Sequence, residues 1–436
     1  MPLIAVTDVL QAGPDRGLWG HYIDTPRPGQ LADGTSIDTW GWVLGRTSQA
    51  RYVEFTLEGQ LLRRVPVHVP RPDVAQSFPD APGATDSGFR TEIPVVGRHA
   101  EFRIEVACRL RDGRRVPIGL VVAERRWREA SARKGEPVLV SVVIPCFNQA
   151  HYLSDAIDSV RAQTHPHVEV VVVDDGSTDN TCAVAERYPG VRYVRQQNEG
   201  LAAARNTGIR HSNGMFLVFL DADDRLTPSA VETGLACLAA HPAAACTFGR
   251  CRWMAPDGSP LPTPAHGCGS DDCFADLLRS NCTGMPATAM YRRGLFEDVH
   301  GFDASGRYAG EDYELALRVA RQFPVWTHDQ VVAEYRIRGG SLSGNPALML
   351  ESVLRVMQAQ RPFATSPTHR AAWSAGVRFW KSYYGEPLAR QLQGCLQRRE
   401  WRQFLSGART LARCHPWGLV GMVSTRRPVH AGSEAR

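Results

Sequence analysis

The chain has 436 residues, 43% of them hydrophobic and 22% charged, which is the composition of an ordinary globular protein and excludes a wholly disordered one. This length is sufficient for two or three domains. The formal net charge of +5 is unevenly distributed, because residues 366–436 hold twelve Lys and Arg against three Glu. Such a basic C-terminal region suits contact with an anionic surface, and it also suits a solvated helical face.

The N-terminal sequence carries no obvious export signal. MPLIAVTDVLQAGPDRG has neither the basic start nor the long apolar core of a signal peptide. No apolar run in the chain approaches the roughly 18 residues needed to span a bilayer. We therefore expect a cytoplasmic protein, with any membrane contact peripheral and on the inner face of the cell membrane.

The eleven cysteines are scattered and include no C-x-x-C pair. This pattern is typical of reduced thiols in a cytosolic protein. The nearest approaches to a cluster are Cys246 with Cys251 and Cys268 with Cys273, and both are spaced more widely than the usual thiolate metal ligands. We expect reduced cysteines and no structural metal there.

Residues 1–127 are predicted to form a β-rich accessory module. RYVEFTLEG places Val53, Phe55 and Leu57 on one face of a strand, and EFRIEVACRL alternates in the same way. RLRDGRRVPIGLVV sets Asp112-Gly113 between two such runs, which favours a hairpin. Several short strands with Gly and Pro punctuation predict a small β-sandwich.

Four large aromatic residues of this module have two possible roles. They either fill the core, which is the commoner use of large rings, or stack on sugars as in carbohydrate-binding modules. The four are Trp19, Tyr22, Trp40 and Trp42.

The pattern changes after the first module. Residues 128–137 are charged, poor in apolar side chains and end in Gly and Pro, so they are predicted to be a linker. From 138 to 345, apolar β-branched runs such as VLVSVVIP alternate with helical patterns. This alternation predicts an α/β domain with a mainly parallel sheet flanked by helices and with ligand chemistry at the carboxyl ends of its strands. Residues 346–436 are predicted to form a basic helical tail.

Polar loops follow the first two buried strands of this domain. They read PCFNQ and DDGSTD, and in a parallel sheet they emerge at the same edge. Asp174 or Asp175 can accept hydrogen bonds from a nucleobase or ribose, and Gly176 allows close approach of the backbone. An Asx-type cap on the following helix would also explain the acids.

The stretch GMFLVFLDADDR ends an apolar strand in three crowded carboxylates. Such crowding costs free energy unless a cation or protons offset it. Asp221 and Asp223 can offer oxygen ligands to Mg²⁺ or Mn²⁺, whereas Asp224 can cap the next helix. The stretch lacks the glycine and the glutamate of a calcium loop.

The stretch YAGEDYELALRVA places Glu311 and Asp312 at the start of a predicted helix. Acids there can simply favour the helix dipole. A carboxylate that faces a metal and nucleotide pocket can instead act as the general base for an acceptor hydroxyl.

Five stretches together resemble one enzyme family. VSVVIPCFNQAHYLSDAIDSVRAQT, VEVVVVDDGSTDNT, NEGLAAARNTGI, FLDADDRLTP and GEDYELALRVA occur in the order found in family-two inverting glycosyltransferases with the GT-A fold. The resemblance covers about residues 138–345. It implies a nucleotide-diphospho-sugar donor, with a UDP-sugar favoured, a divalent metal, and single-displacement transfer with inversion.

The resemblance also assigns roles to individual residues. It places Asp221 and Asp223 in the metal and diphosphate motif, and Asp312 at the catalytic base. It places Pro145 and Asn148 in the first donor loop and Asp175 at the aspartate that contacts the nucleobase. The segment that flanks the nucleotide contains Gly200, Arg205 and Asn206.

One position departs from the family pattern. Related enzymes often carry a histidine in a YRxH segment, but this chain reads EYRIRGGSLSG, with Arg338 in that place. A guanidinium cannot ligate a metal, but it can contact phosphate bidentately. We therefore expect a weakly held metal, with Arg336 or Arg338 supplementing the positive charge on the diphosphate.

The expected partners follow from the same resemblance. The acceptor is a saccharide or a lipid-linked saccharide, as in the assembly of a bacterial surface polysaccharide. Nucleic acid is not expected, since no recognised module accompanies the basic residues, and the C-terminal helices either pack on the catalytic domain or lie on a membrane surface. Two other classes stay open, a sugar-nucleotidyltransferase and a non-catalytic carbohydrate-binding protein.

Overall fold

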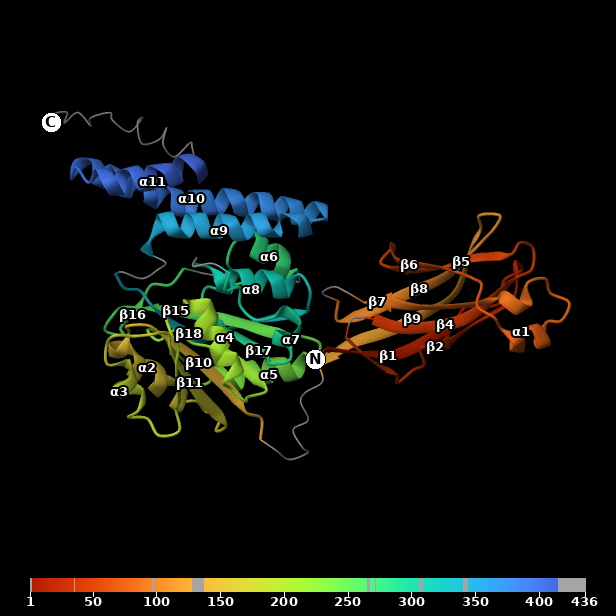
Figure 1. The fold of residues 1–436 in the computed structure, drawn as a ribbon, viewed down its shortest axis with the longest axis horizontal. Coiled ribbons are helices and arrows are strands. Elements are labelled where there is room, and N and C mark those ends of the chain that lie inside the picture. Colours follow the sequence, from red (N-terminus) through yellow and green to blue (C-terminus); the bar gives the residue numbers. More distant parts are fainter. Residues whose placement is uncertain are drawn as a thin grey trace, which may run out of the picture.

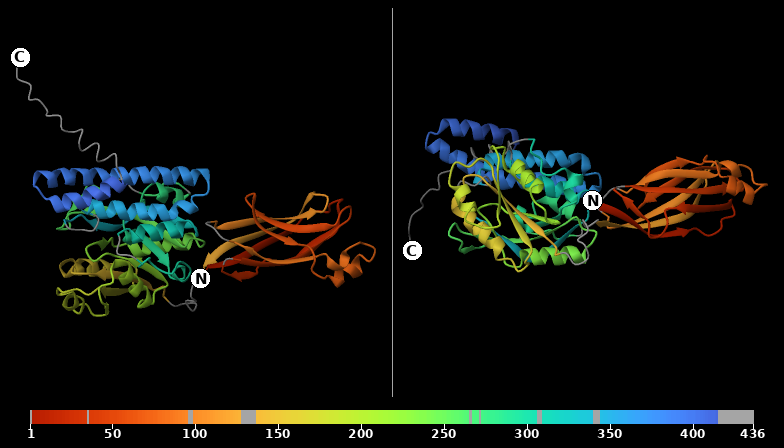
Figure 2. Two further views of the ribbon diagram at one scale, coloured as in Figure 1. Left: turned by 45° about the horizontal axis from the view of Figure 1, so that its top comes forward. Right: turned by 60° about the horizontal axis from the view of Figure 1, so that its bottom comes forward.

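The computed structural model describes residues 2–34, 36–95, 99–127, 137–264, 267–270, 272–305, 309–339 and 344–414. A β-sandwich forms one end of the molecule and an α/β body the other, with the C-terminal helices layered over the body (Figure 1). The additional views show the sandwich projecting from the side of the body (Figure 2). The α/β body with an N-terminal sandwich and a helical C-terminal region confirms the predicted fold class.

The sandwich consists of antiparallel strands in two sheets. One has the order β3-β1-β9-β8-β5-β6, formed by Leu31–Asp33, Pro2–Gln11, Arg115–Trp127, Glu101–Leu110, Ala50–Leu57 and Gln60–Pro66. The other has the order β2-β4-β7, formed by Leu18–Thr25, Ser36–Gly45 and Gly88–Pro94, and the short helix α1 is Pro72–Ser77. Val53, Phe55 and Phe102 lie fully buried between the sheets, as the alternation predicted.

The aromatic residues of the sandwich are not used in the same way. Trp19, Tyr22 and Trp40 are 42%, 50% and 41% exposed, so the core alternative is wrong for these three. Trp42 is half-buried and packs against Phe78. The three exposed rings lie in β2 and β4, where the alternating pattern gives one face of the sheet to solvent.

The end of the sandwich contacts the α/β body directly. Trp127, the last residue of β9, donates a hydrogen bond from Nε1 to the Ala243 carbonyl at 3.0 Å, and its ring packs against Phe323. The predicted linker, residues 128–137, lies outside the described residues except for Pro137.

The α/β body is built on a mixed sheet. Its strand order is β12-β11-β10-β13-β17-β15-β18-β14, with β16 paired to β15. The strands β12, β11, β10 and β13 run parallel, whereas β17 pairs with β13 and β15 in antiparallel fashion. In chain order the strands are Val140–Cys146 (β10), Val168–Asp174 (β11), Arg192–Arg195 (β12), Phe216–Phe219 (β13), Arg225–Leu226 (β14), Cys246–Met254 (β15), Pro260–Leu261 (β16), Ala289–Arg292 (β17) and Val325–Arg336 (β18).

Helices cover both faces of this sheet. The central strand β10 is buried along its whole length, with Val143 in the core on one face and Val142 and Ile144 in the core on the other. The continuous apolar run predicted this, because a strand covered on both faces has no polar side. The helices of the body are Ala150–Arg161 (α2), Thr181–Ala185 (α3), Leu201–Arg210 (α4), Ala230–Ala240 (α5), Cys273–Arg279 (α6), Leu295–Val299 (α7) and Glu311–Ala320 (α8).

The C-terminal helices α9 (Pro346–Gln360) and α10 (Pro367–Gln397) pack on the body, and α11 (Trp401–Cys414) packs on them. Gly376 of α10 lies so close to the Leu278 carbonyl of α6 that a Cβ there would clash with it. No helix among the described residues is long and apolar enough to cross a membrane.

One cysteine prediction is wrong. Cys268 and Cys282 form a disulfide, with Cα atoms 5.2 Å apart. The helix α6 lies between them in the sequence, and the chain segments on either side of it bring these residues, 14 positions apart, together. Spacing along the sequence does not reveal this contact, since it depends on how α6 docks. Among the described residues, no group of three or more His, Cys, Asp or Glu forms a metal site.

Candidate functional site

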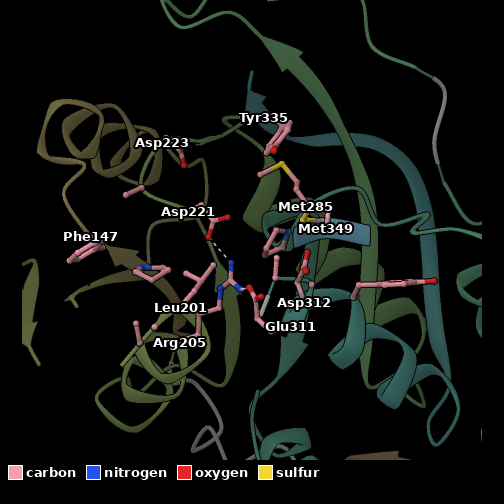
Figure 3. Close-up of a pocket in the computed structure, with 18 of the residues that line it drawn as sticks. Phe147, Leu201, Arg205, Asp221, Asp223, Met285, Glu311, Asp312, Tyr335 and Met349 are labelled. Atoms are coloured by element: carbon pink, nitrogen blue, oxygen red, sulfur yellow. Dashed lines mark hydrogen bonds and ion pairs between the residues drawn. The ribbon is translucent and has the colours of Figure 1, made fainter. Parts of the chain in front are cut away.

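A cavity of about 640 Å³ opens at the carboxyl ends of the parallel strands (Figure 3). The turns after β10, β11 and β13 form one wall, and α8, α9 and α10 contribute to the other. Ligand sites in open α/β sheets usually lie at this edge. Of the residues predicted from the sequence, those that line the cavity are Pro145, Asn148, Asp175, Gly200, Arg205, Asp221, Asp223, Asp312 and Arg338.

The first two strand-end loops are tied together by Asn148. Its side-chain Oδ1 accepts a hydrogen bond from the Thr178 backbone N–H at 2.8 Å, and its own N–H donates to Ser177 Oγ at 3.0 Å. Asn148 has a φ of +53°, a conformation that asparagine tolerates better than most residues. Its neighbour Phe147 is left 46% exposed at the cavity wall.

Asp175 shapes the segment that precedes α4. Its carboxylate is buried and accepts hydrogen bonds from Gln196 Nε2 at 2.7 Å, from the Glu199 N–H at 3.0 Å and from the Gly200 N–H at 2.8 Å. Gly200 has a φ of +94°, which favours glycine. Asp175 therefore fixes this loop, and it also lines the cavity.

Asp174, the alternative at this position, serves the local fold. Its Oδ1 accepts from the Ser177 N–H at 2.7 Å, as in an Asx-type turn, and its Oδ2 accepts from the Tyr193 hydroxyl at 2.5 Å. Asp174 is not among the cavity-lining residues.

The three carboxylates after β13 have separate surroundings. Asp221 accepts from Arg205 Nη2 at 2.6 Å, and Asp223 accepts from Arg338 Nε at 2.6 Å. Asp224 is fully buried and accepts from the Arg336 backbone N–H at 2.8 Å, which joins this turn to the end of β18. Asp224 is thus structural, while Asp221 and Asp223 face the cavity.

Two of these acids have raised pKa values. Burial, together with the negative charge of Asp221, raises the pKa of Asp223 despite Arg338. Burial and the charges of Asp223 and Asp221 raise the pKa of Asp224 well above its ordinary value. This end of the sheet therefore favours the binding of additional positive charge or protons.

Arg205 of α4 is the cation at the centre of the site. It is fully buried and bonds through Nη2 to Asp221 and through Nη1 to Glu311, the first residue of α8. Although burial alone would lower it, the charges of Asp221, Glu311 and Asp312 raise the pKa of Arg205 above its ordinary value. One guanidinium thus fixes the end of β13 against the start of α8 (Figure 3).

Asp312 lies beside this arginine and faces the cavity. Gly310 at φ +86° begins the turn into α8, and Asp312 follows in the first turn of that helix. Burial is the main cause that raises the pKa of Asp312, while Arg205 and the Tyr313 N–H act in the opposite direction. The arrangement provides a carboxylate that is easier to protonate than an exposed aspartate.

The two arginines near the end of β18 differ. Arg336 is buried, and its guanidinium donates to the Asp223 carbonyl, the Pro256 carbonyl and Asp155 Oδ2 at 2.6 to 2.8 Å. It does not line the cavity, whereas Arg338 does. Of the alternatives Arg336 and Arg338, the structure therefore brings only Arg338 to the site.

Asn206 is also separate from the cavity. Its side chain donates to the Phe302 carbonyl at 2.9 Å and accepts from the Phe302 N–H at 2.8 Å, and thereby holds the chain before α8. The family resemblance implied that Asn206 flanks the nucleotide. In the structure, its side-chain hydrogen bonds go to the backbone of Phe302.

Several residues at the cavity were not found from the sequence. Glu311 was weighed together with Asp312 as an acid at a helix start, but its pairing with Arg205, which spans 106 residues, was not predicted. Phe147 carries a local signal, because it lies within the PCFNQ loop. The cavity residues of the C-terminal helices carry no such local signal, since helical spacing shows that one face is apolar but not that it borders a site. They are Met349, Val353, Trp380 and Tyr384.

The donor set for a divalent ion consists of Asp221 and Asp223. In each carboxylate one oxygen bonds to an arginine, and the other oxygen could bind an ion. Among the described residues, no third acid, His or Cys joins them to form a metal group. Two carboxylates fit an ion such as Mg²⁺, which commonly takes one or two protein carboxylates and completes its shell with substrate phosphates. The residues present therefore suit an ion that arrives with a phosphorylated ligand.

Replacing Arg205 with methionine should destabilise the protein strongly. The change leaves Asp221 and Glu311 without their shared cation, and breaking a buried pair in this way costs about 3–5 kcal/mol. Urea denaturation of the variant measures the loss. Adding Glu311→Leu to Arg205→Met should recover part of it. Arg187→Met, at an exposed side chain, should change the free energy of unfolding by less than about 0.5 kcal/mol. An Arg205→Met variant as stable as the wild type would contradict this role for the buried arginine.

Comparison with known proteins identifies the family. The sequence model of the protein family "Glycosyl transferase family 2" matches residues 141–299. The putative teichuronic acid biosynthesis glycosyltransferase TuaG of Bacillus subtilis is 30% identical over 213 residues, which are 48% of this chain and 82% of TuaG. An uncharacterized glycosyltransferase of Rickettsia felis is 30% identical over 207 residues, 46% of this chain, and the chain spans only 33% of that longer protein.

A solved structure is similar at a lower sequence identity. The crystal structure of S. aureus TarS 1-349 is 18% identical, with 63% of this chain and 91% of that one covered and a TM-score of 0.40. The part of the chain that the family model matches, residues 141–299, contains all of β10 except Val140, the strands from β11 to β17 and the acids after β13. Since the similarity extends over four fifths of TuaG at 30% identity, the chain belongs to glycosyl transferase family 2.

Proposed function

We propose that this glycosyltransferase moves a sugar, with inversion, from a nucleoside-diphosphate sugar to an acceptor hydroxyl during assembly of a bacterial surface polysaccharide. One observation carries the proposal: Asp312 and the pair Asp221 and Asp223 face the same cavity from different elements. The name of TuaG, which refers to teichuronic acid biosynthesis, supports the polysaccharide context.

The wall formed by the loops after β10 and β11 would bind the nucleotide. Phe147 offers an exposed ring on which a base can stack, and Asp175 keeps acceptor capacity beyond the loop N–H groups it already binds, because an ionised carboxylate has about four lone-pair sites. A UDP-sugar is the preferred donor in this proposal.

The diphosphate would lie at the end of β13. Asp221 and Asp223 would hold Mg²⁺ or Mn²⁺, which when bound neutralises charge on the departing diphosphate. Arg338, which pairs with Asp223 in the structure, has a guanidinium that can contact a phosphate oxygen as well. Binding of the donor would thus supply the negative charge that both Arg338 and the ion can share.

Asp312 would act as the general base. In an inverting transfer the acceptor oxygen bonds to the anomeric carbon as the bond from that carbon to the diphosphate oxygen breaks. The electron pair leaves with the nucleoside diphosphate, and the acceptor proton passes to the Asp312 carboxylate. Arg205 keeps this aspartate ionisable despite its burial and fixes α8 on the side of the cavity opposite the nucleotide loops.

Asparagine at position 312 should abolish most transfer without abolishing donor binding. Loss of a general base costs about 10²–10⁴ in rate, and Asn keeps the shape of the side chain. Incubating a panel of UDP- and GDP-sugars with the wild type and Mg²⁺ or Mn²⁺ identifies the donor, and calorimetry with that donor measures its affinity for the variant. The exposed acid Asp329, changed to Asn, is the matched control and should transfer normally.

The products of the same incubation separate the possible functions. Nucleoside diphosphate with free or transferred sugar supports the proposal. Pyrophosphate release would instead indicate a sugar-nucleotidyltransferase, and binding without any turnover would indicate a carbohydrate-binding protein.

The pH dependence of transfer should reveal the raised pKa of Asp312. Only the ionised carboxylate accepts a proton, so kcat/KM should fall as the pH falls through the raised pKa, at a higher pH than the value of about 3.9 for an exposed aspartate. Charged and titratable groups that interact with Asp312 are Glu311, Arg205, Asp221, Tyr291 and Tyr384. The acid limb should be missing from the residual activity of Asp312→Asn, and circular dichroism at each pH checks that the fold persists. An identical limb in the variant would assign it to another group.

Replacing Arg338 with alanine should raise the donor KM or lower kcat. The change removes a cation from the diphosphate side of the cavity, and a charged hydrogen bond of this kind is worth about 1.5–3 kcal/mol, or roughly 10- to 100-fold. Steady-state kinetics with varied donor gives both constants. Arg338→Lys keeps the charge without the planar fork and should show a smaller loss. Unchanged kinetics in Arg338→Ala would refute a role on the diphosphate.

A further inference from the structure

The second wall of the cavity differs in chemistry from the nucleotide wall. It is apolar and aromatic, and it comes from the loop after α6 and from the C-terminal helices: Met285, Met349, Val353, Trp380 and Tyr384. Figure 3 places Asp312 on the same side as Met285 and Met349, with Phe147 on the far side. The wall therefore borders the base and not the nucleotide loops.

Helix α10 is fixed relative to that base. Trp380 donates from Nε1 to the Tyr313 hydroxyl at 3.3 Å, and that hydroxyl in turn donates to the Leu277 carbonyl at 2.6 Å. The rings of Tyr313 and Trp380 also meet edge to face, with centroids 5.6 Å apart. Because Tyr313 follows Asp312 in the chain, these contacts set the distance between α10 and the base.

Tyr384 extends this arrangement into the cavity. Its half-buried ring stacks on Trp380 at a centroid distance of 5.6 Å and an interplanar angle of 9°. Its hydroxyl makes no hydrogen bond to another of the described residues, in contrast to Tyr313. Burial, with smaller contributions from Tyr383, Tyr335 and Asp312, raises the pKa of Tyr384, so the hydroxyl stays protonated and can donate.

We propose that this wall is the acceptor subsite, that it receives a pyranose ring of a saccharide, and that the Tyr384 hydroxyl hydrogen-bonds the ring and contributes to specificity. The inference rests on the proposed function, since it concerns the second substrate of the same cavity.

The chemistry of the wall selects this class of acceptor. A pyranose has a face of C–H groups, which packs on aromatic rings and thioethers, and a rim of hydroxyls, which needs hydrogen-bond partners. Met285 and Met349 supply the first kind of contact and Tyr384 the second. The α9 and α10 side chains at the cavity, Met349, Val353, Trp380 and Tyr384, carry no cation to hold an anionic acceptor group.

Phenylalanine at position 384 tests the hydroxyl alone. Transfer is measured from the donor identified above to methyl glycosides of glucose, galactose, mannose and N-acetylglucosamine. In Tyr384→Phe the acceptor KM should rise about tenfold, the size of one lost hydrogen bond, while the donor KM changes less than twofold. Its neighbour Tyr383 is 52% exposed, so Tyr383→Phe is the matched control and should keep both constants.

A second variant fills the subsite. Met349→Trp adds volume at the wall and should abolish transfer to the methyl glycosides while release of sugar to water continues, whereas Met349→Leu should retain transfer. Tyr384→Phe with the kinetics of Tyr383→Phe, or a Met349→Trp variant that still transfers, would overturn the subsite. So would a wild type that hydrolyses the donor but uses none of the glycosides. A wild type that releases sugar from no nucleotide-sugar would instead contradict the proposed function.

Discussion

The site depends on one buried guanidinium. Arg205 of α4 joins Asp221, at the end of β13, to Glu311, at the start of α8, and its charge also acts on Asp312. Isolated buried carboxylates would have to protonate or leave the interior, whereas a shared cation allows several to stay together. This arginine therefore couples the position of the end of β13 to that of the start of α8, and both border the cavity. A displacement of α8 would change both.

The acids after β13 show how charge is distributed in the same cavity. Asp224 accepts a backbone hydrogen bond that holds the turn against β18. Asp221 forms an ion pair with Arg205, and Asp223 forms one with Arg338. Asp221 and Asp223, the two of these carboxylates that face the cavity, each have an arginine partner, so the charge at this strand end is partly balanced before any ligand binds. An ion that enters here competes with arginine for oxygen ligands, which favours one that brings phosphate oxygens with it. In the proposed function Arg338 would therefore be a partner of Asp223 and not a substitute for it as a metal ligand.

The C-terminal helices have more than a structural use. Their docking on α6, where Gly376 meets the Leu278 carbonyl, brings Trp380 against Tyr313 and so places α10 beside Asp312, the residue before Tyr313. One wall of the cavity comes from loops of one half of the sheet, and the opposite wall comes from helices late in the chain. Under the proposed function, this division would allow the donor wall and the acceptor wall to vary independently.

The sequence by itself determined the elements and the chemistry of individual loops. The apolar run of β10 predicted a strand covered on both faces, and the local pattern drew attention to Asp221 and Asp223 at a strand end. At the start of α8 the pattern offered Glu311 and Asp312 alike, and only the family resemblance selected Asp312. Only the tertiary structure decided which charges meet. Arg205 pairs with Glu311 across 106 residues, and Arg338 pairs with Asp223 across 115. Arg336 does not line the cavity and bonds to Asp155. Cys268 forms a disulfide with Cys282, on the other side of α6 in the sequence. Periodicity reports which face of an element is buried, but the partner across that face depends on the packing of elements distant in sequence.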